Sequence, residues 1–308
     1  MTRKTIRMIE IGLGAVLVLF IIVLVVFVKP QNRQVTPNSS VVSSMVSSSE
    51  ASSESTSSES ISSAASVSSA SSVAASSEEE TVSVTIPEGY SLQKICQRLA
   101  DKGVGSYDTL LKTATTYNFS SYSCIANASK TNRCYTLEGY LFPATYEFYK
   151  GEAPADVFGK MLHAFDSNTA AYKSKAIASC GSLDKAIILA SVIEKEAGNP
   201  NYVANVSSVF HNRLSVGMKL QADSTISYLN SLGTALCDKY KYYYNTERFV
   251  GLPAGPICNP GLRALNAAVN PASTKYMYFC TDNQDPPQYY FAVTLDEHKA
   301  NLKKCGYQ

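Results

Sequence analysis

The sequence contains no tryptophan and only three histidines among its 308 residues. Its eight cysteines include no C-x-x-C pair. Because zinc sites draw their ligands from closely spaced cysteines and histidines, this pattern argues against a metal site. Lys and Arg (27) nearly balance Asp and Glu (25), and the sequence has no basic stripe of the kind that binds nucleic acid. We therefore expect neither a metal nor a nucleic-acid partner.

The longest apolar run lies near the N-terminus, where Ile11 to Val28 follow three basic residues. As a helix this run is about 27 Å long, close to the thickness of a bilayer core. It lacks the cleavage site of a signal peptide, although a removed signal peptide is the alternative interpretation. Basic flanks stay on the cytoplasmic side, so we expect residues 1–10 in the cytoplasm and one transmembrane helix at 11–28. The rest of the chain would then lie outside the cell membrane.

The segment that follows, residues 29–80, is dominated by serine and predicts a disordered linker. From Val41 to Glu80 it contains no aromatic residue, glycine or proline. Such a composition cannot bury enough apolar surface to fold. We expect the folded part to comprise a small α+β subdomain at 81–133 and a larger domain at 134–308.

The cysteines are open to two interpretations. All eight lie beyond the predicted membrane helix, where disulfides are expected, but buried thiols remain the alternative. Cys124 and Cys134 bracket the polar segment "IANASKTNR" and are the one pair that we predict to be bonded.

The predicted subdomain begins with alternating apolar residues from Val82 to Ile86, which indicate a strand. Ser91 then caps a helix that ends at Gly103, and "SYDTLLKTATTY" predicts a second helix. This pattern fits a small carbohydrate-binding module and fits a plain packing unit equally well.

The segment "YTLEGYLFPATYEFYKG" places aromatic residues beside a carboxylate. Sugar rings stack on aromatic faces, and their hydroxyls need acceptors such as Glu138. Tyr140 and Phe142 would supply the aromatic faces. The same residues could instead form a core strand.

The stretch "ILASVIEKEAGN" predicts a buried helix that ends in two carboxylates. Ser182 is a suitable N-cap, and Gly198 ends a helix predicted at 183–197. Two residues on a helix are about 200° apart, so Glu194 and Glu196 cannot face the same groove. We expect one to be catalytic, with a pKa raised by burial, and the other to be supporting. Two solvated carboxylates are the alternative.

Beyond this helix the pattern predicts a second one with Val203, Val206, Val209, Phe210 and Leu214 on its apolar face, ending at Gly217. Further on, Thr294 and Glu297 have the spacing of a capping box.

From about Val82 to Leu302 the chain resembles the endolytic murein transglycosylases of the MltG/YceG-like family. The motifs that carry this resemblance are "IPEG", "LEGYLFPATY", "ASVIEKEAG", "VANVSSVFHNRL", "GMKLQADSTISY", "YNTERFVGLPAGPICNPG" and "LNAAVNPASTKYMYF". The resemblance implies an α+β fold, with a lysozyme-like/YceG-like catalytic domain and a small LysM-like subdomain that is only partly present here.

The resemblance also implies an activity. Members cleave peptidoglycan strands at the β-1,4 bond between N-acetylmuramic acid and N-acetylglucosamine and leave a 1,6-anhydro end. The catalytic glutamate of the family matches Glu196 in "EKEAG". Glu196 would first donate a proton to the glycosidic oxygen and then remove one from the muramic acid C6 hydroxyl. No cofactor is implied.

We assign substrate-binding roles to residues around Glu196. Those expected to donate or accept hydrogen bonds or to orient groups are Glu138, Gln221, Asp223, Tyr244, Asn245 and Thr246. Those expected to form groove walls are Tyr140, Phe142, Leu252 and Pro253. Glu194 would support the site by pairing with Arg213 or by accepting a hydrogen bond from a backbone group. Asn212 and Arg213 could equally brace helices.

Two other functions stay open from the sequence. A hydrolytic muramidase would use Glu196 as acid and Asp223 as base. A non-enzymatic wall-binding scaffold would use neither. By family analogy, we expect the protein to act on nascent glycan strands beside peptidoglycan polymerases at the outer face of the cell membrane.

Overall fold

A two-stranded antiparallel sheet opens the described chain. The computed structural model describes residues 80–282 and 284–307, so the predicted cytoplasmic segment, transmembrane helix and nearly all of the linker lie outside the described residues. Strand β1 (Thr81–Thr85) pairs with β2 (Thr145–Tyr149), with Val84 opposite Tyr146. The predicted first strand is confirmed. Its partner lies beyond residue 133, so the sheet crosses the domain boundary that we predicted there.

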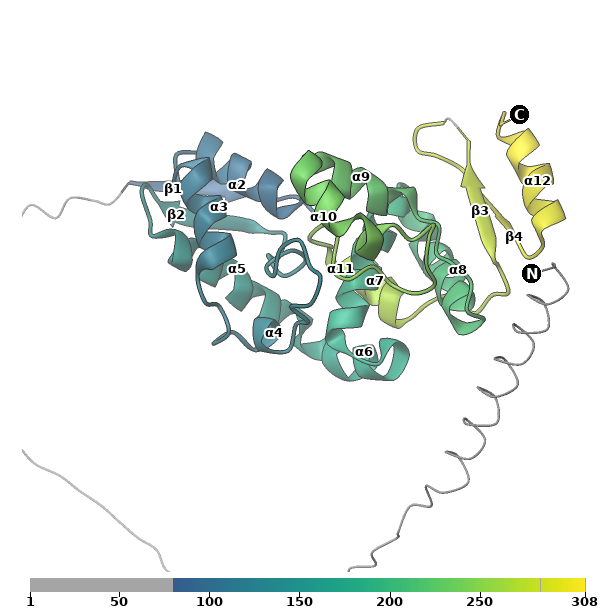
Figure 1. The fold of residues 1–308 in the computed structure, drawn as a ribbon, viewed down its shortest axis with the longest axis horizontal. Helices are drawn as coiled ribbons and strands as arrows, with labels where there is room; N and C mark the ends of the chain where they lie inside the picture. The colour runs from purple at the N-terminus through teal and green to yellow at the C-terminus, as the bar shows by residue number, and fades with distance from the viewer. Residues whose placement is uncertain (1–79, 283, 308) are drawn as a thin grey trace, which may run out of the picture. The chain divides into compact units, whose positions relative to one another are not determined.

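The helices of the first part of the described chain lie beside this sheet (Figure 1). Helix α2 (Leu92–Asp101) begins at Ser91, whose hydroxyl accepts the N–H of Lys94, and α3 (Tyr107–Thr116) packs against it. Helix α5 (Pro154–Thr169) covers α3 and the short α4 (Ser123–Ala126). The predicted cap at Ser91 is confirmed, and Gly103 has the positive φ that ends such a helix.

Helix α7 (Leu183–Glu196) is the centre of the larger part. Every residue from Ala186 to Ile193 is buried, because α7 is packed on several sides at once. Its neighbours are α6 (Lys173–Cys180), α8 (Val203–Ser215), α9 (Asp223–Ser231) and α11 (Leu262–Val269). Ser182 accepts the N–H of Lys185, which confirms the predicted N-cap.

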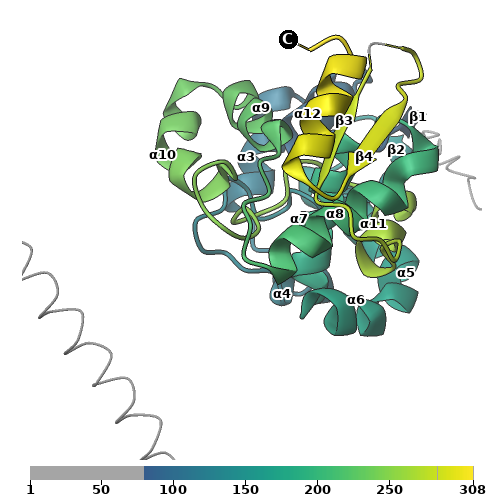
Figure 2. The same ribbon diagram turned by 90° about the vertical axis from the view of Figure 1, so that its right-hand side faces the viewer.

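The remaining elements cover this centre. Helix α10 (Thr234–Tyr244) packs against α9, and the short 3-10 turns at Ala170–Tyr172 and Pro200–Tyr202 lead into α6 and α8. Strands β3 (Tyr278–Thr281) and β4 (Tyr289–Ala292) pair antiparallel and carry α12 (Leu295–Lys304), as Figure 2 shows from their side. Thr294 and Glu297 form the predicted capping box.

Helices and two separate small sheets thus give a mixed α and β fold, as predicted. Within residues 80–282 and 284–307, no single helix combines the length and hydropathy of a membrane span. One pair of helices bent by 90°, Pro154–Cys180 and Leu183–Glu196, meets both criteria only when taken together.

Candidate active site

Glu196 is the last residue of α7 and is half-buried. Its Oε1 accepts the backbone N–H of Ser224 at 3.2 Å, in the first turn of α9, where the helix dipole favours negative charge. Burial raises the pKa of this carboxyl. The neighbouring Ser224 and Arg213 lower that pKa, Asp223 raises it, and burial is the largest influence. The carboxyl can therefore retain a proton and can also be stabilised once it has lost it.

A pocket of about 440 Å³ opens beside this carboxyl. Its walls come from the turn before α2 and its first turn, the end of α7, one face of α9 and the loop before α11, so four segments far apart in sequence meet there. Glu196 and Asp223 supply carboxyl groups, and five residues supply hydroxyls: Ser91, Ser224, Ser227, Tyr228 and Ser231. Such a lining offers many hydrogen-bond partners to a polar ligand such as a sugar.

Tyr289 of β4 fixes the backbone at the end of α7. Its hydroxyl donates to the carbonyl of Glu196 at 2.5 Å and accepts the N–H of Gly198 at 2.8 Å. Helix ends leave carbonyl groups without intrahelical partners, and Tyr289 satisfies one of them. Sequence reasoning missed this residue, because nothing in "YYFAVTLDEH" indicates a contact with a helix so distant in the chain.

We expect Tyr289→Phe to lower kcat about tenfold with little change in KM. The backbone at the end of α7 would lose two hydrogen bonds, one at the Glu196 carbonyl and one at the Gly198 N–H, worth about 1 kcal/mol each. Tyr290→Phe is the matched control, since side chains alternate along a strand and Tyr290 points to the other face. Steady-state kinetics on purified glycan strands would check this. Unchanged kcat in Tyr289→Phe would show that Tyr289 does not position Glu196.

Glu194 faces different neighbours from Glu196, as the helix geometry predicts. Its Oε2 accepts the N–H of Gly261 at 3.3 Å, just before α11, and burial raises its pKa. The predicted hydrogen bond from a backbone group is confirmed. The alternative pairing with Arg213 is wrong, because that guanidinium donates to the carbonyls of Met277 at 2.7 Å and Leu220 at 2.6 Å.

Asn212 belongs with Arg213 in this bracing role. Its amide donates to the carbonyls of Thr274 at 3.0 Å and Tyr276 at 2.9 Å. The Asn212 and Arg213 side chains of "HNRL" thus connect α8 to the segment that leads into β3.

Glu138 does not face a groove, contrary to the prediction. Its side chain has no exposed surface, and its carboxylate oxygens accept the N–H of Leu92, the hydroxyl of Tyr228 and the amide of Asn259, all at 3.0–3.1 Å. Burial raises its pKa to about 8 despite these bonds. Glu138 therefore joins the N-terminus of α2 to α9 and to the loop before α11.

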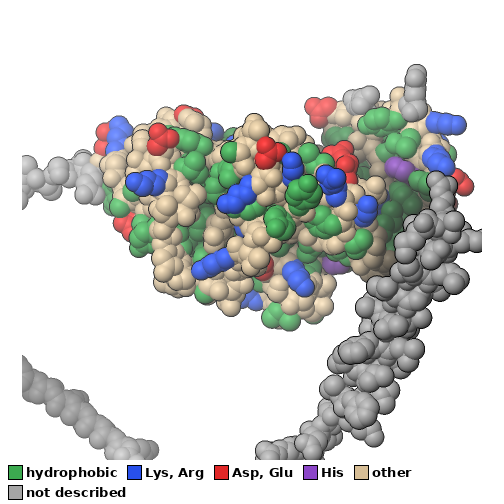
Figure 3. All heavy atoms as spheres, viewed as in Figure 1, with side chains coloured by type: hydrophobic (Ala, Val, Ile, Leu, Met, Phe, Trp, Pro, Cys, Tyr) green, Lys and Arg blue, Asp and Glu red, His purple; other side chains and the backbone are tan. Residues whose placement is uncertain are grey.

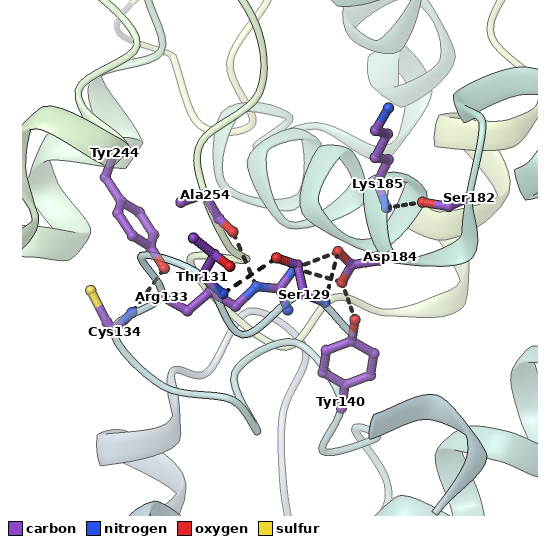
Figure 4. Close-up of polar contacts among 10 residues, drawn as sticks. All are labelled: Ser129, Thr131, Arg133, Cys134, Tyr140, Ser182, Asp184, Lys185, Tyr244 and Ala254. Carbon is purple, nitrogen blue, oxygen red and sulfur yellow. Dashed lines mark hydrogen bonds and ion pairs between the residues drawn. The ribbon is translucent and has the colours of Figure 1, made fainter. Parts of the chain in front are cut away.

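Tyr140 is likewise buried and does not line the Glu196 pocket, contrary to the prediction. Its hydroxyl donates to Asp184, which also accepts two contacts of 2.6 Å from one Arg133 nitrogen (Figure 4). Figure 4 shows both side chains converging on Asp184 near the start of α7, while Lys185 points away. This cluster holds the 133–140 segment against α7, at the opposite end from Glu196.

The polar residues predicted from "LQADST" and "YYYNTE" lie close together. Thr246 is buried, and its hydroxyl accepts the N–H of Ala222, while its carbonyl accepts that of Gln221. Gln221 has a φ of 50°, a strained value for a residue other than glycine. These contacts fix the turn that presents Asp223 and Ser224 to the pocket.

Other predicted residues lie elsewhere. Tyr244 is buried and accepts the N–H of Cys134, and Asn245 caps the end of α10. Leu252 and Pro253 line a separate pocket of about 650 Å³ beside the first half of α7. Phe142 is half-buried against the core. Of the predicted binding residues, the structure thus brings Asp223 to the Glu196 pocket directly and Gln221 and Thr246 to its supporting turn.

All eight cysteines are free in the structure, so the predicted Cys124–Cys134 disulfide is not formed. Among the described residues, no group of three His, Cys, Asp or Glu side chains is placed to hold a metal ion. On the face that Figure 3 shows, Lys and Arg side chains lie singly among polar and apolar atoms.

Comparison with known proteins decides the family. The model of the YceG-like family matches residues 32–304. The chain belongs to the YceG-like family. The resemblance noted from its motifs is thereby confirmed.

Relatives and a solved structure agree with this assignment. The endolytic murein transglycosylase of Bacillus subtilis (strain 168) is 30% identical over 236 residues, which cover 72% of this chain and 64% of the relative. That of Streptococcus pneumoniae serotype 2 is 28% identical, over 73% of this chain and 45% of the relative. The crystal structure of a yceG-like protein from Listeria monocytogenes superposes with a TM-score of 0.62 at 32% identity, over 71% of this chain and 75% of that one. The chain therefore spans between about half and two thirds of the two transglycosylases' length.

Proposed function

We propose that this YceG-like protein is an endolytic lytic transglycosylase that cleaves peptidoglycan glycan strands. The observation that carries the proposal is the Glu196 carboxyl, half-buried with a raised pKa at the edge of a pocket lined by hydroxyl groups. The names of its relatives support the same activity.

The surroundings of Glu196 suit a residue that acts as acid and then as base. In the first half, burial favours the protonated carboxyl, which donates its proton to the glycosidic oxygen between N-acetylmuramic acid and N-acetylglucosamine. In the second half, the Ser224 N–H and the positive end of α9 stabilise the carboxylate. That carboxylate removes the proton of the muramic acid C6 hydroxyl as its oxygen attacks C1, which closes the 1,6-anhydro ring. The substrate supplies its own nucleophile.

Hydrolysis is the second candidate reaction, because Asp223 lines the same pocket and could activate water. We expect Asp223→Asn to keep most of the activity and to yield the same anhydro products, since the proposed reaction needs no second carboxylate. Digestion of purified, uncrosslinked glycan strands followed by mass spectrometry checks this. A loss of two or more orders of magnitude in rate would favour the muramidase reading.

We further propose the setting in which this activity occurs. The basic and apolar N-terminal pattern supports a single transmembrane helix at 11–28, with residues 1–10 cytoplasmic and the catalytic part outside the cell membrane. The serine-rich segment would tether the enzyme near nascent strands made by peptidoglycan polymerases. The order of β1, α2, α3 and β2 supports a small LysM-like glycan-binding unit in front of the catalytic centre.

A further inference from the structure

Two cysteines far apart in the sequence lie in contact near the C-terminus. The sulfur atoms of Cys280 and Cys305 are 3.5 Å apart, and both residues are buried. Cys280 belongs to β3, and Cys305 caps the end of α12. Other thiols contact backbone instead: that of Cys180 donates to Ala268 and that of Cys258 to Ser191.

Helix α12 is held to the β3–β4 sheet by partly exposed side chains: Asn301 donates to the carbonyl of Phe291, and His298 stacks on Tyr278. It packs against β3 and β4, yet none of the residues from Leu295 to Lys304 is buried. A helix without buried side chains gains little from burial of apolar surface, so it opens readily. The next residue, Cys305, is buried, and its sulfur contacts that of Cys280.

We propose that Cys280 and Cys305 form a disulfide that fastens α12 to the β3–β4 sheet. A bonded pair has its sulfur atoms about 2.05 Å apart. The two sulfur atoms, now 3.5 Å apart, reach that distance when the side chains of Cys280 and Cys305 move slightly toward each other. The bond would persist outside the cell membrane, where disulfides are stable, and this part of the argument rests on the proposed topology.

The oxidant is a disulfide, supplied either by a small molecule or by a thiol–disulfide oxidoreductase. One cysteine thiolate attacks a sulfur of that disulfide, which releases one thiolate and leaves a mixed disulfide. The second cysteine, as thiolate, attacks the protein sulfur of the mixed disulfide and releases the other thiolate. The donor disulfide is thus reduced to two thiols, and the two protein thiols are oxidised to one bond.

The surroundings of the Cys280 thiol determine at which stage of folding the disulfide forms. Burial and the neighbouring Cys305 raise the pKa of the Cys280 thiol to about 12, so its thiolate is scarce once α12 is docked. The bond should therefore form quickly while the chain folds and slowly in the folded, reduced protein. Once formed, it would also steady β4, whose Tyr289 holds the carbonyl of Glu196.

Peptide mapping of the full-length protein in detergent tests the proposal. One sample is refolded with oxidised and reduced glutathione and another with reductant alone, and free thiols are then alkylated before digestion with trypsin. Cleavage after Lys275, Lys299 and Lys304 yields peptides 276–299 and 305–308, each with a single cysteine. We expect these two peptides to be joined in the oxidised sample, lighter by two hydrogens, and separate after reduction.

Hydrogen exchange of the α12 amides gives a second readout. We expect oxidation to slow exchange at least several-fold in the wild-type protein and in the control Cys180→Ser, but not in Cys305→Ser or Cys280→Ser. Full alkylation of both cysteines after oxidative refolding would overturn the proposal. So would pairing of either cysteine with another one, or equal exchange of α12 in both redox states. None of these readouts depends on glycan cleavage.

Discussion

Glu196→Gln is expected to lose several orders of magnitude in the rate of glycan cleavage while its melting temperature stays unchanged or rises. Each proton transfer by a positioned side chain contributes roughly 10²–10⁴-fold, and Glu196 is assigned two of them. Glutamine keeps the size of the side chain and an oxygen that can accept the Ser224 N–H. It also removes a carboxyl whose ionisation is disfavoured by burial. Rates on purified strands and thermal melts of the same preparation check both parts.

Glu194→Gln is the matched control, because it makes the same chemical change two residues away. Glu194 contacts the Gly261 N–H rather than the pocket, so we expect measurable activity. Its carboxylate is also attracted by Arg263 and Lys195, and glutamine loses both attractions, so we expect a lower melting temperature. Exchange of the two behaviours would contradict the assignment and make Glu194 the catalytic acid.

Glu138→Ala is expected to destabilise the fold by about 3 kcal/mol or more, the largest effect on stability among the residues discussed. The change leaves the Leu92 N–H, the Tyr228 hydroxyl and the Asn259 amide without their acceptor in the interior. Each unsatisfied buried group costs about 1–3 kcal/mol. Urea denaturation of the wild-type and mutant proteins measures the difference. A loss below about 1 kcal/mol would mean that water or other groups replace the carboxylate.

Glu138 also gives the protein a pH-dependent stability. Its pKa is about 8 in the folded protein, against an ordinary value of 4.5, so the unfolded chain loses this proton at a lower pH than the folded protein does. The contribution of Glu138 to stability is therefore fully present below about pH 4.5 and is lost as pH rises toward about 8. Glu138→Gln should remove this fall between those values. If the unfolding free energies of the wild-type protein and Glu138→Gln change with pH in the same way over these values, the raised pKa is contradicted.

Local features were the ones that sequence reasoning could predict. The caps at Ser91 and Ser182, the Thr294–Glu297 capping box and the end of α7 depend on residues a few positions apart. The opposite orientation of Glu194 and Glu196 follows from helix geometry alone. The residues of each interaction lie within one or two helical turns of one another, so the local sequence pattern is enough to predict it.

Contacts between distant segments could not be predicted in the same way. Glu138 and Tyr140 have the residue types of a sugar groove, but their exposure depends on Tyr228, Asn259 and Asp184, which lie far along the chain. Tyr289 reaches Glu196 across a separation of 93 residues. Burial and contacts between distant residues depend on the packing of the whole fold. A side chain that can hydrogen-bond to a sugar can equally well form a hydrogen bond in the protein interior.

The origin of the oxygen at the new muramic acid end tests the central claim most directly. Purified, uncrosslinked glycan strands are digested by the full-length protein in heavy-oxygen water, and product masses are measured. Because the proposed nucleophile is the C6 hydroxyl of the substrate, we expect anhydro ends that contain no heavy oxygen, and none of these ends with Glu196→Gln. Reducing ends that carry one heavy oxygen would show that water attacks instead, and would contradict the account.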